Sequence, residues 1–521
     1  MTNPSTLYRG GVLHSPADPN ATALLVSDGR ITWLGVDADA PAADRVVELG
    51  GALVTPAFVD AHVHATDTGL ALSGLDLSGV RSAGELLDAV AGFAAGLPAD
   101  AVVLGHGWDE SRWGAPQLPD AEVLDRAAGG RRVYLSQASI HSALVSRAML
   151  AAVPEVVAAA GFDESGWVRR DAHHVVRAAA FASVTRAQRV AAQRVALAHA
   201  ASLGVAAVHE CGGPEISDED DFTGLLGISG AGVPEVYGYW GELGGAARAR
   251  ELGAVGAGGD LFADGALGSR TAHLSQPYLD GEGVGHGYLS AEQVREHLLD
   301  CAAHGLQGGF HAIGDAAIGT VLEGFAAVVR RLGVERVRAA RHRIEHAEIV
   351  DKRLIAGFVE YGIVASMQPA FDRLWGGAGG MYESRLGLAR SLASNPMGAM
   401  HSVGVALAFG SDSPVTPVDP WGSVRAAAAH HSAAQRMSVR AAFAAHTRGG
   451  WRAVHLDNEG VLALGAPATF AVWDTPAGVD RGLPVLLADD PELRGPQDPT
   501  PLPVCRRTVL RGDVIYEEGS A

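Results

Sequence analysis

Cysteines and long apolar runs are scarce in this chain of 521 residues, and each scarcity excludes a class of protein. Three cysteines, with no Cys-x-x-Cys pair among them, cannot form a paired disulfide framework. No stretch reaches the roughly 18 consecutive apolar residues that span a bilayer. The first residues also lack the basic and apolar regions of a secretory signal. We therefore expect a cytoplasmic protein with buried, reduced thiols.

Basic residues are also in deficit. Lysine and arginine together number 40 against 59 acidic residues, which gives a formal net charge of −19. This balance disfavours nucleic acid and anionic membranes as partners. Lysine itself occurs once, at Lys352, and this bears on the metal chemistry below. The apolar content of 48%, with 67 glycines and 25 prolines, is typical of a loop-rich globular enzyme.

Both ends of the chain carry short strand signals. They lie at residues 7–13, 23–26 and 31–35 and, near the other end, at residues 469–473, 507–510 and 512–516. The Asp28-Gly29 turn joins two of them into a hairpin. Each end is too short to fold alone. We therefore predict one small composite β-sandwich domain, formed by residues 1–55 and 456–521.

Strand and helix signals alternate between the two ends. Ser82, Thr185 and Ser290 open helical patterns, and about ten short apolar runs lie between the helices. This alternation predicts the α/β class and a TIM-like (β/α)8 barrel over residues 56–455. A closed barrel of this type needs eight strands. We therefore assign the surplus runs to an insertion around residues 211–259.

Histidines and one aspartate stand where several apolar runs end. His62 and His64 close the first run, and alternation along a strand points both rings the same way. His311, His346 and Asp412 each end another run, just before a loop. The carboxyl ends of barrel strands meet at one mouth, so we expect these five side chains to converge. Imidazoles and a carboxylate are the ligands of a catalytic zinc-like ion.

Five segments of the chain together resemble the amidohydrolase superfamily. The resemblance is closest to its YtcJ-like branch, amidohydrolase family 3, which includes N-substituted formamide deformylases. The segments are Pro56–His64, Ala263–Ala272, His311–Asp315, Arg343–Ala347 and Gly410–Pro414. The flanking β segments match as well. The resemblance implies a metal-dependent hydrolase of non-peptide C–N bonds, acting on a small molecule, and we expect a homodimer.

The resemblance also implies the metal ligands, which are His62, His64, His311, His346 and Asp412. Many members carry a carboxylated lysine that bridges two metals, and Asp260 stands at that position here. Lys352 cannot replace it, because it lies beyond the sixth strand. The side chain of aspartate is several bonds shorter than that of a carboxylated lysine. Asp260 is therefore either a metal ligand or a residue that hydrogen-bonds to the ligands. One or two divalent ions are expected. Zinc suits these donors, and iron, manganese or cobalt would also fit.

Catalytic roles follow from the chemistry of amide hydrolysis. We predict that Asp412 orients the water, accepts its proton and delivers it to the leaving nitrogen. His346 is either a metal ligand or a donor to the developing oxyanion. For the substrate, His141 either contacts it at the mouth or is structural. Trp108 either lines the pocket or packs.

Two other functions stay open. A deaminase on the same barrel would use one metal and a further carboxylate near His311. No glutamate follows within a turn, but Asp315 does. The third hypothesis is a non-catalytic metal-binding barrel, which would have no need of Asp412.

Overall fold

The computed structural model describes residues 4–114, 117–138, 142–490, 493–495 and 498–519. The chain divides into two compact units, one of Met1–Ala65 with Leu197–Ala521 and one of Thr66–Ala196. Within the described ranges, no helix combines the length and the apolar character needed to span a membrane. The three cysteines are buried and free, as predicted.

The larger unit contains an eight-stranded parallel sheet, which confirms the predicted barrel. Its strands are β7 (Phe58–Val63), β13 (Val205–Gly212), β14 (Glu235–Trp240), β15 (Gly256–Ala257), β16 (Gln307–Ala312), β17 (Arg343–His346), β18 (Val364–Met367) and β19 (Ala406–Phe409). His64 N donates to Ser413 O (2.9 Å) and Asp412 N donates to His62 O (2.8 Å). These two bonds join the first strand to the loop after the last one and close the barrel.

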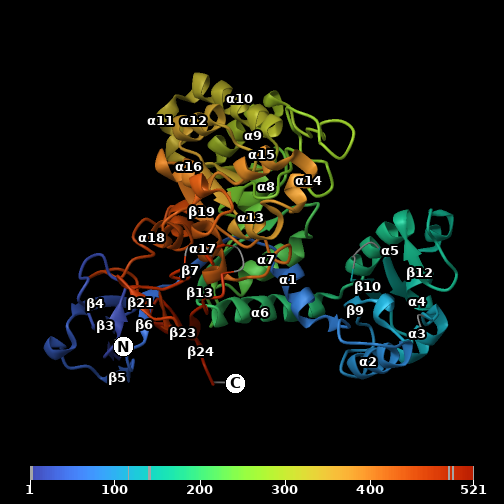
Figure 1. Ribbon diagram of the computed structural model, residues 1–521, viewed down its shortest axis with the longest axis horizontal. Coiled ribbons are helices and arrows are strands. Elements are labelled where there is room, and N and C mark those ends of the chain that lie inside the picture. Colours follow the sequence, from blue (N-terminus) through green and yellow to red (C-terminus); the bar gives the residue numbers. More distant parts are fainter. Residues whose placement is uncertain (1–3, 115–116, 139–141, 491–492, 496–497, 520–521) are drawn as a thin grey trace. The chain divides into compact units, whose positions relative to one another are not determined.

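Helices follow the barrel strands along the chain. They include α7 (Glu219–Gly227), α8 (Ala246–Glu251), α9 (Ala291–His304), α10 (Asp315–Leu332), α12 (Lys352–Tyr361), α16 (Met397–Ser402) and α18 (Val439–Ala445). Helices α9, α10 and α12 lie together on one side of the barrel (Figure 1). A capping box of Ser290 and Gln293 begins α9, which ends at Gly305 in the left-handed conformation. The predicted helix start is therefore confirmed, since such caps pair amides that the first turn leaves free.

Two more sheets of this unit use the chain ends. The first contains β2 (Val12–Leu13), β6 (Leu53–Pro56), β20 (Phe470–Asp474), β23 (Val504–Leu510) and β24 (Asp513–Glu517), and the second contains β4 (Arg30–Gly35), β3 (Ala23–Ser27), β1 (Thr6–Arg9) and β5 (Arg45–Glu48). Tyr8 and Leu24 share one buried cluster with Phe470 and Val509. The composite β domain is therefore confirmed, and its exact boundaries stay a prediction.

The structure contradicts the insertion predicted around residues 211–259, because β14 and β15 of the barrel lie there. The additional sheet belongs to the smaller unit, between β7 and β13. Its strands are β8 (Leu75–Asp76), β9 (Val103–Trp108), β10 (Val133–Gln137), β11 (Ser142–Val145) and β12 (Trp167–Arg169). The helices α2 (Ala83–Ala95), α3 (Ala121–Ala127) and α5 (Arg170–Ala182) accompany it. A short apolar run followed by a helix has the same local pattern in either sheet.

Candidate metal centre

Six buried side chains meet at the carboxyl end of the barrel. They are His62, His64, Asp260, His311, His346 and Asp412, none of which is more than 9% exposed. His62 lies in β7, His311 in β16, and His346 is the last residue of β17. The structure thus brings together all the residues that the sequence predicted as ligands, Asp260 included.

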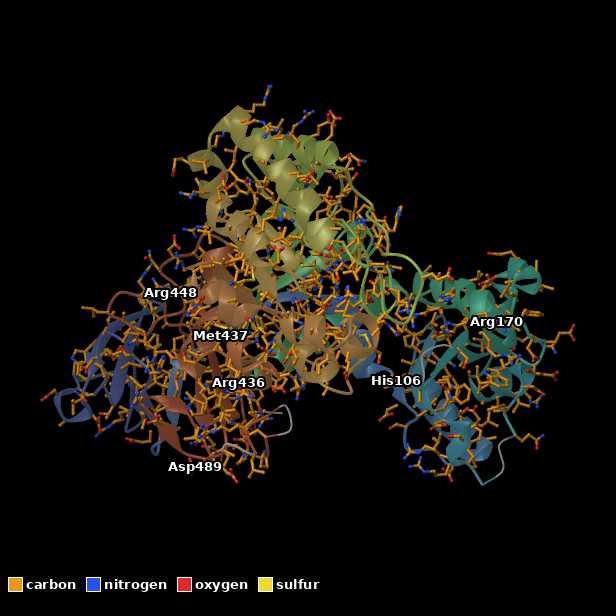
Figure 2. The ribbon with its side chains drawn as sticks, turned by 45° about the horizontal axis from the view of Figure 1, so that its top comes forward. His106, Arg170, Arg436, Met437, Arg448 and Asp489 are labelled. Atoms are coloured by element: carbon orange, nitrogen blue, oxygen red, sulfur yellow. The ribbon has the colours of Figure 1, made fainter. Side chains whose placement is uncertain are left out.

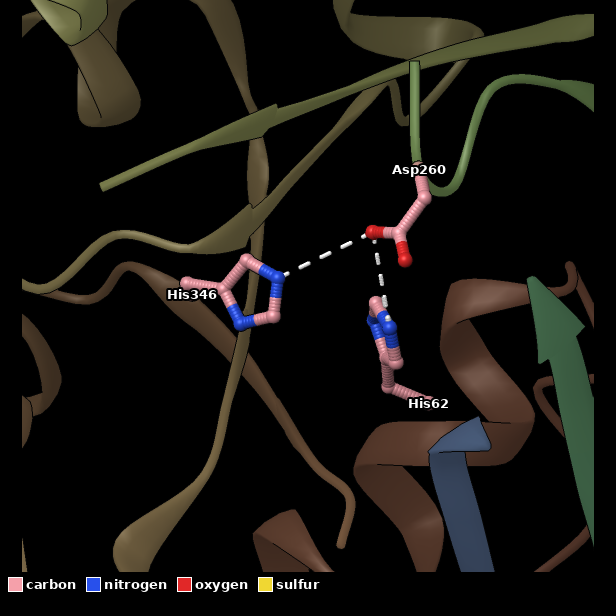
Figure 3. Close-up of side chains that lie close together, drawn as sticks. All are labelled: His62, Asp260 and His346. Carbon is pink, nitrogen blue, oxygen red and sulfur yellow. Dashed lines mark ion pairs between the residues drawn. The ribbon is translucent and has the colours of Figure 1, made fainter. Parts of the chain in front are cut away.

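Asp260 lies in ion-pair range of all four histidines. Its Oδ1 is 3.6 Å from His62 Nε2, 3.5 Å from His311 Nδ1 and 3.7 Å from His346 Nε2. Its Oδ2 is 3.3 Å from His64 Nε2. Figure 3 shows the carboxylate directed at His62 and His346, which come from different strands. Asp412 Oδ1 lies 3.4 Å from His62 Nε2 and 3.2 Å from His64 Nε2.

These atoms fit the donor set of a divalent cation. His62 Nε2, His311 Nδ1, His346 Nε2 and Asp260 Oδ1 are buried and make no hydrogen bond within the described part of the chain. Ligands at about 2.0–2.1 Å from a shared tetrahedral ion lie roughly 3.3 Å apart, close to the separations seen here. Among the described residues, three sets have their ligand atoms within 4.8 Å of one another, and two of them consist of these side chains: His62, Asp260 and His346, and His62, His64 and Asp412. The third set is His62, Cys211 and Glu345.

Partners behind the rings select which nitrogen faces Asp260. His62 Nδ1 is 3.0 Å from Glu345 Oε2, and His311 Nε2 is 3.2 Å from Gly265 O. Both oxygens only accept, so these nitrogens carry the proton of the neutral ring, and the opposite nitrogens are the ones that a bound cation would contact. His346 Nδ1 is 2.9 Å from Gln368 Oε1, which has the same effect. Three imidazoles therefore direct toward one point a nitrogen of the kind that can bind a metal ion.

A bulge explains how a short aspartate reaches this point. Ala257 pairs with Gly308, but the next pairing in register is Phe262 with His311. Between these two pairs the chain advances five residues on the first strand, from Ala257 to Phe262, but only three on the second, from Gly308 to His311. The first strand therefore contains two extra residues, which form a bulge. Gly259 has φ 77°, and a Cβ there would lie 3.0 Å from Cys211 Sγ. Glycine permits this path, and the bulge moves Asp260 toward the four rings.

The backbone is strained at two of the six residues. His346 has φ 69° and Asp412 has φ 57°, which side-chain-bearing residues adopt infrequently. Alternation along β17 places Glu345 inside the barrel and would turn His346 away. The left-handed conformation brings the His346 ring back to the mouth. Strain of this kind clusters at functional sites, which supports a site here.

Charges within the group oppose the effect of burial. Burial alone would lower the pKa of His64, but the carboxylates of Asp260 and Asp412 outweigh it and raise that pKa well above its ordinary value. Burial alone would raise the pKa of Asp260, but the surrounding histidines hold that pKa well below its usual range. Asp260 is therefore ionised, as a metal ligand must be.

Glu345 and Arg343 were not predicted as site residues. Glu345 accepts from Arg343 Nε (2.8 Å) and from His62, and Arg343 also donates to His209 Nδ1 (2.8 Å). Burial alone would raise the pKa of Glu345, but Arg343 and His62 lower it well below the usual range. The sequence contained a signal for this pair. Arg343 and Glu345 are two residues apart on one strand and therefore lie on the same face of it. Charged side chains on a fully buried strand require partners of opposite charge or hydrogen-bonding groups.

We expect Glu345→Gln to lower metal affinity or activity about 10–100-fold, as for other groups that orient metal-binding histidines. Glutamine keeps the shape but removes the charge that holds the proton on His62 Nδ1. Metal titration of the purified variant measures the effect. Glu459→Gln is the matched control, because it removes another buried glutamate paired with arginine, here Arg511. Unchanged metal affinity and activity in Glu345→Gln would contradict this role.

Of the two residues predicted to contact the substrate, the structure describes Trp108. Trp108 is fully buried in the core of the smaller unit, and its Nε1 donates to Leu135 O (2.8 Å). Of the two roles expected for Trp108, this position fits packing in the hydrophobic core and not contact with a substrate. His141 lies outside the described residues.

The fold and this donor set define a metal-dependent barrel hydrolase. The sequence model of the Amidohydrolase family matches residues 45–516, and the chain belongs to this family. It is similar to YtcJ of Bacillus subtilis (strain 168), which is named as an amidohydrolase, with 25% identity covering 98% of this chain and 99% of that protein. The predicted family is therefore confirmed.

Two further similarities concern hydrolases. An N-substituted formamide deformylase of Arthrobacter pascens is 29% identical over 25% of each chain. The crystal structure of an uncharacterized metal-dependent hydrolase from Pyrococcus furiosus matches with a TM-score of 0.74 and 26% identity, covering 90% of this chain and 98% of that one. A divalent metal as cofactor is consistent with both the relatives and the donor set.

Proposed function

We propose that this hydrolase cleaves a non-peptide C–N bond, that of an amide or an N-substituted formamide. The observation that carries the proposal is the convergence of four imidazoles and two carboxylates at the mouth of the barrel. Family membership and the partial similarity to a formamide deformylase support the choice of bond.

The ligands that we propose are His62, His64, His311, His346, Asp260 and Asp412. The two oxygens of Asp260 face different histidines, so Asp260 would hold the one or two ions at the position where other members carry a carboxylated lysine. We expect zinc, and iron, manganese or cobalt would also suit these donors. A bound divalent metal would lower the pKa of its water to about 7 and would polarise a carbonyl oxygen.

Asp412 is the proposed general base and acid. Its Oδ1 faces the same point as His62 Nε2 and His64 Nε2, where it accepts the proton of the attacking water and passes it to the leaving nitrogen. Of the two roles predicted for His346, the ligand is favoured. Its Nδ1 proton is directed to Gln368, so Nε2 has no proton to donate to an oxyanion.

The two rival functions are less well supported. A deaminase would need a further carboxylate that is free to act near His311. Asp315 accepts hydrogen bonds from Ser275 N (2.8 Å) and from the Ser275 hydroxyl. Asp264, whose Oδ1 lies 4.0 Å from His311 Nε2, accepts from three backbone amides. A non-catalytic metal barrel gives no reason for the strained conformation of Asp412. The small organic substrate, the homodimer, the cytoplasmic location and the lack of a nucleic-acid partner stay predictions.

Product analysis tests the function. The metal-loaded enzyme is incubated with a panel of N-formyl amines, simple amides and amino-heterocycles, and formate, carboxylate and ammonia are measured. We expect formate or carboxylate release that stops after chelation and returns when metal is added. Ammonia as the primary product from amino-heterocycles would indicate a deaminase. Bound metal with no product from any substrate would favour the non-catalytic barrel.

A further inference from the structure

A cavity lies at the opposite end of the barrel from the metal centre. It has a volume of about 530 Å³, and its lining includes Arg341, Val364 and Ala406. Val364 and Ala406 begin β18 and β19, and Arg341 precedes β17 by two residues. The metal-centre residues follow the other ends of these strands. The five residue-to-residue steps from Arg341 to His346 span roughly 17 Å, so the cavity is separate from the metal centre.

Positive charge dominates this cavity. Arg338, Arg341, Arg448 and Arg452 line it together with His401, and its lining within the described part of the chain includes no acidic residue. This concentration is unexpected in a protein with a net charge of −19. Nearby acids neutralise the arginines only in part. Arg341 and Arg452 share a single carboxylate, that of Asp457.

Two arginines differ in how they are held. Arg338 donates to Glu360 O (2.8 Å) and lies 3.7 Å from Glu335 Oε1. The guanidinium of Arg448, which is labelled in Figure 2, has no hydrogen-bond or ion-pair partner among the described residues. An exposed guanidinium with free donors, beside three held in place, is suited to bind an anion.

The remaining lining leaves room for a ligand. It consists largely of glycine and alanine, such as Gly404, Gly449 and Ala444, so that few side chains fill the space between the arginines. The volume is within the range of small-molecule sites. We propose that this cavity binds a small organic oxyanion, a phosphate monoester or a di- or tricarboxylate, through the four arginines. Guanidinium groups recognise both oxyanions by paired hydrogen bonds.

Calorimetry on the full-length, metal-loaded protein tests this proposal. Inorganic phosphate and succinate are titrated at low ionic strength as probes of the two oxyanion classes. We expect saturable binding of at least one probe, and the tighter probe identifies the class. Arg448→Gln should raise its Kd at least tenfold. Ala444→Glu, which adds an opposing charge at an exposed lining position, should abolish binding.

Arg45→Gln is the matched control, because Arg45 is an exposed arginine on β5, outside the cavity. It should leave the Kd unchanged. Arg448 has no partner to lose, so the thermal unfolding midpoint of Arg448→Gln should match that of the parent. Anion binding at the metal centre would be insensitive to Arg448. A Kd unaffected by Arg448→Gln, or no saturable binding of either probe, would overturn the proposal.

Discussion

Asp260→Asn is expected to lower the affinity for metal at least about 100-fold, and kcat/KM in parallel. Asparagine keeps the size of the side chain but loses the charge and one of the two acceptor oxygens. Those oxygens lie within 3.3–3.7 Å of the facing nitrogens of His62, His64, His311 and His346. Removal of a direct ligand should lower metal affinity by more than the roughly 10–100-fold that is typical when a residue hydrogen-bonded to a ligand is removed.

Metal content per chain after dialysis, and kcat/KM across a metal titration, measure this effect. Excess metal should restore part of the activity, because the other ligands remain. Asp372→Asn is the control, since Asp372 is also buried and lies 3.3 Å from His430 and 3.1 Å from His431. The Asp372→Asn variant should retain the metal content of the parent protein. If Asp260→Asn also keeps its full metal content, Asp260 is not a ligand.

Asp412→Asn is expected to lower kcat about 10²–10⁴-fold, the usual contribution of general acid–base catalysis. Asparagine retains one oxygen facing His62 and His64 but cannot accept a proton from water. Unlike the loss in Asp260→Asn, this loss should persist at saturating metal. Rate measurements at several metal concentrations therefore separate a defect in proton transfer from a defect in metal binding.

Asp351→Asn is the matched control for Asp412. Asp351 also follows a barrel strand, but its side chain caps α12 by accepting from Leu354 N (2.8 Å). Asparagine is an equally good cap, so both stability and kcat should stay near the parental values. Activity in Asp412→Asn within a factor of about ten of the parent would exclude the proposed role.

The positions of the histidines could be predicted because each depends on local pattern and one general rule. His62 and His64 are two residues apart on a strand, and His311 ends an apolar run. In a parallel barrel, all strand ends of one kind meet at the same mouth. Alternation along a single strand is enough to orient His62, His64 and His311. It is not enough for His346, whose ring reaches the mouth through the left-handed backbone of that residue.

Asp260 could not be decided in this way. Its reach depends on two extra residues between the paired positions of β15 and β16, and a sequence does not show the pairing register of two strands. Glu345 was missed for a related reason. Its role depends on contacts with Arg343 and His62, and His62 is 283 positions away along the chain.

The sequence by itself determined the class of fold, the family and the kinds of ligand, because these follow from strand-end residues and from segments that recur together. The tertiary structure decided which apolar runs join the barrel, since those at 102–104 and 133–135 lie in the sheet of the smaller unit. The tertiary structure also decided which ring nitrogens of the histidines face the candidate metal centre, and how the short side chain of Asp260 reaches it. Periodicity is a property of neighbouring residues, whereas strand pairing and proton position depend on groups that only folding brings into contact.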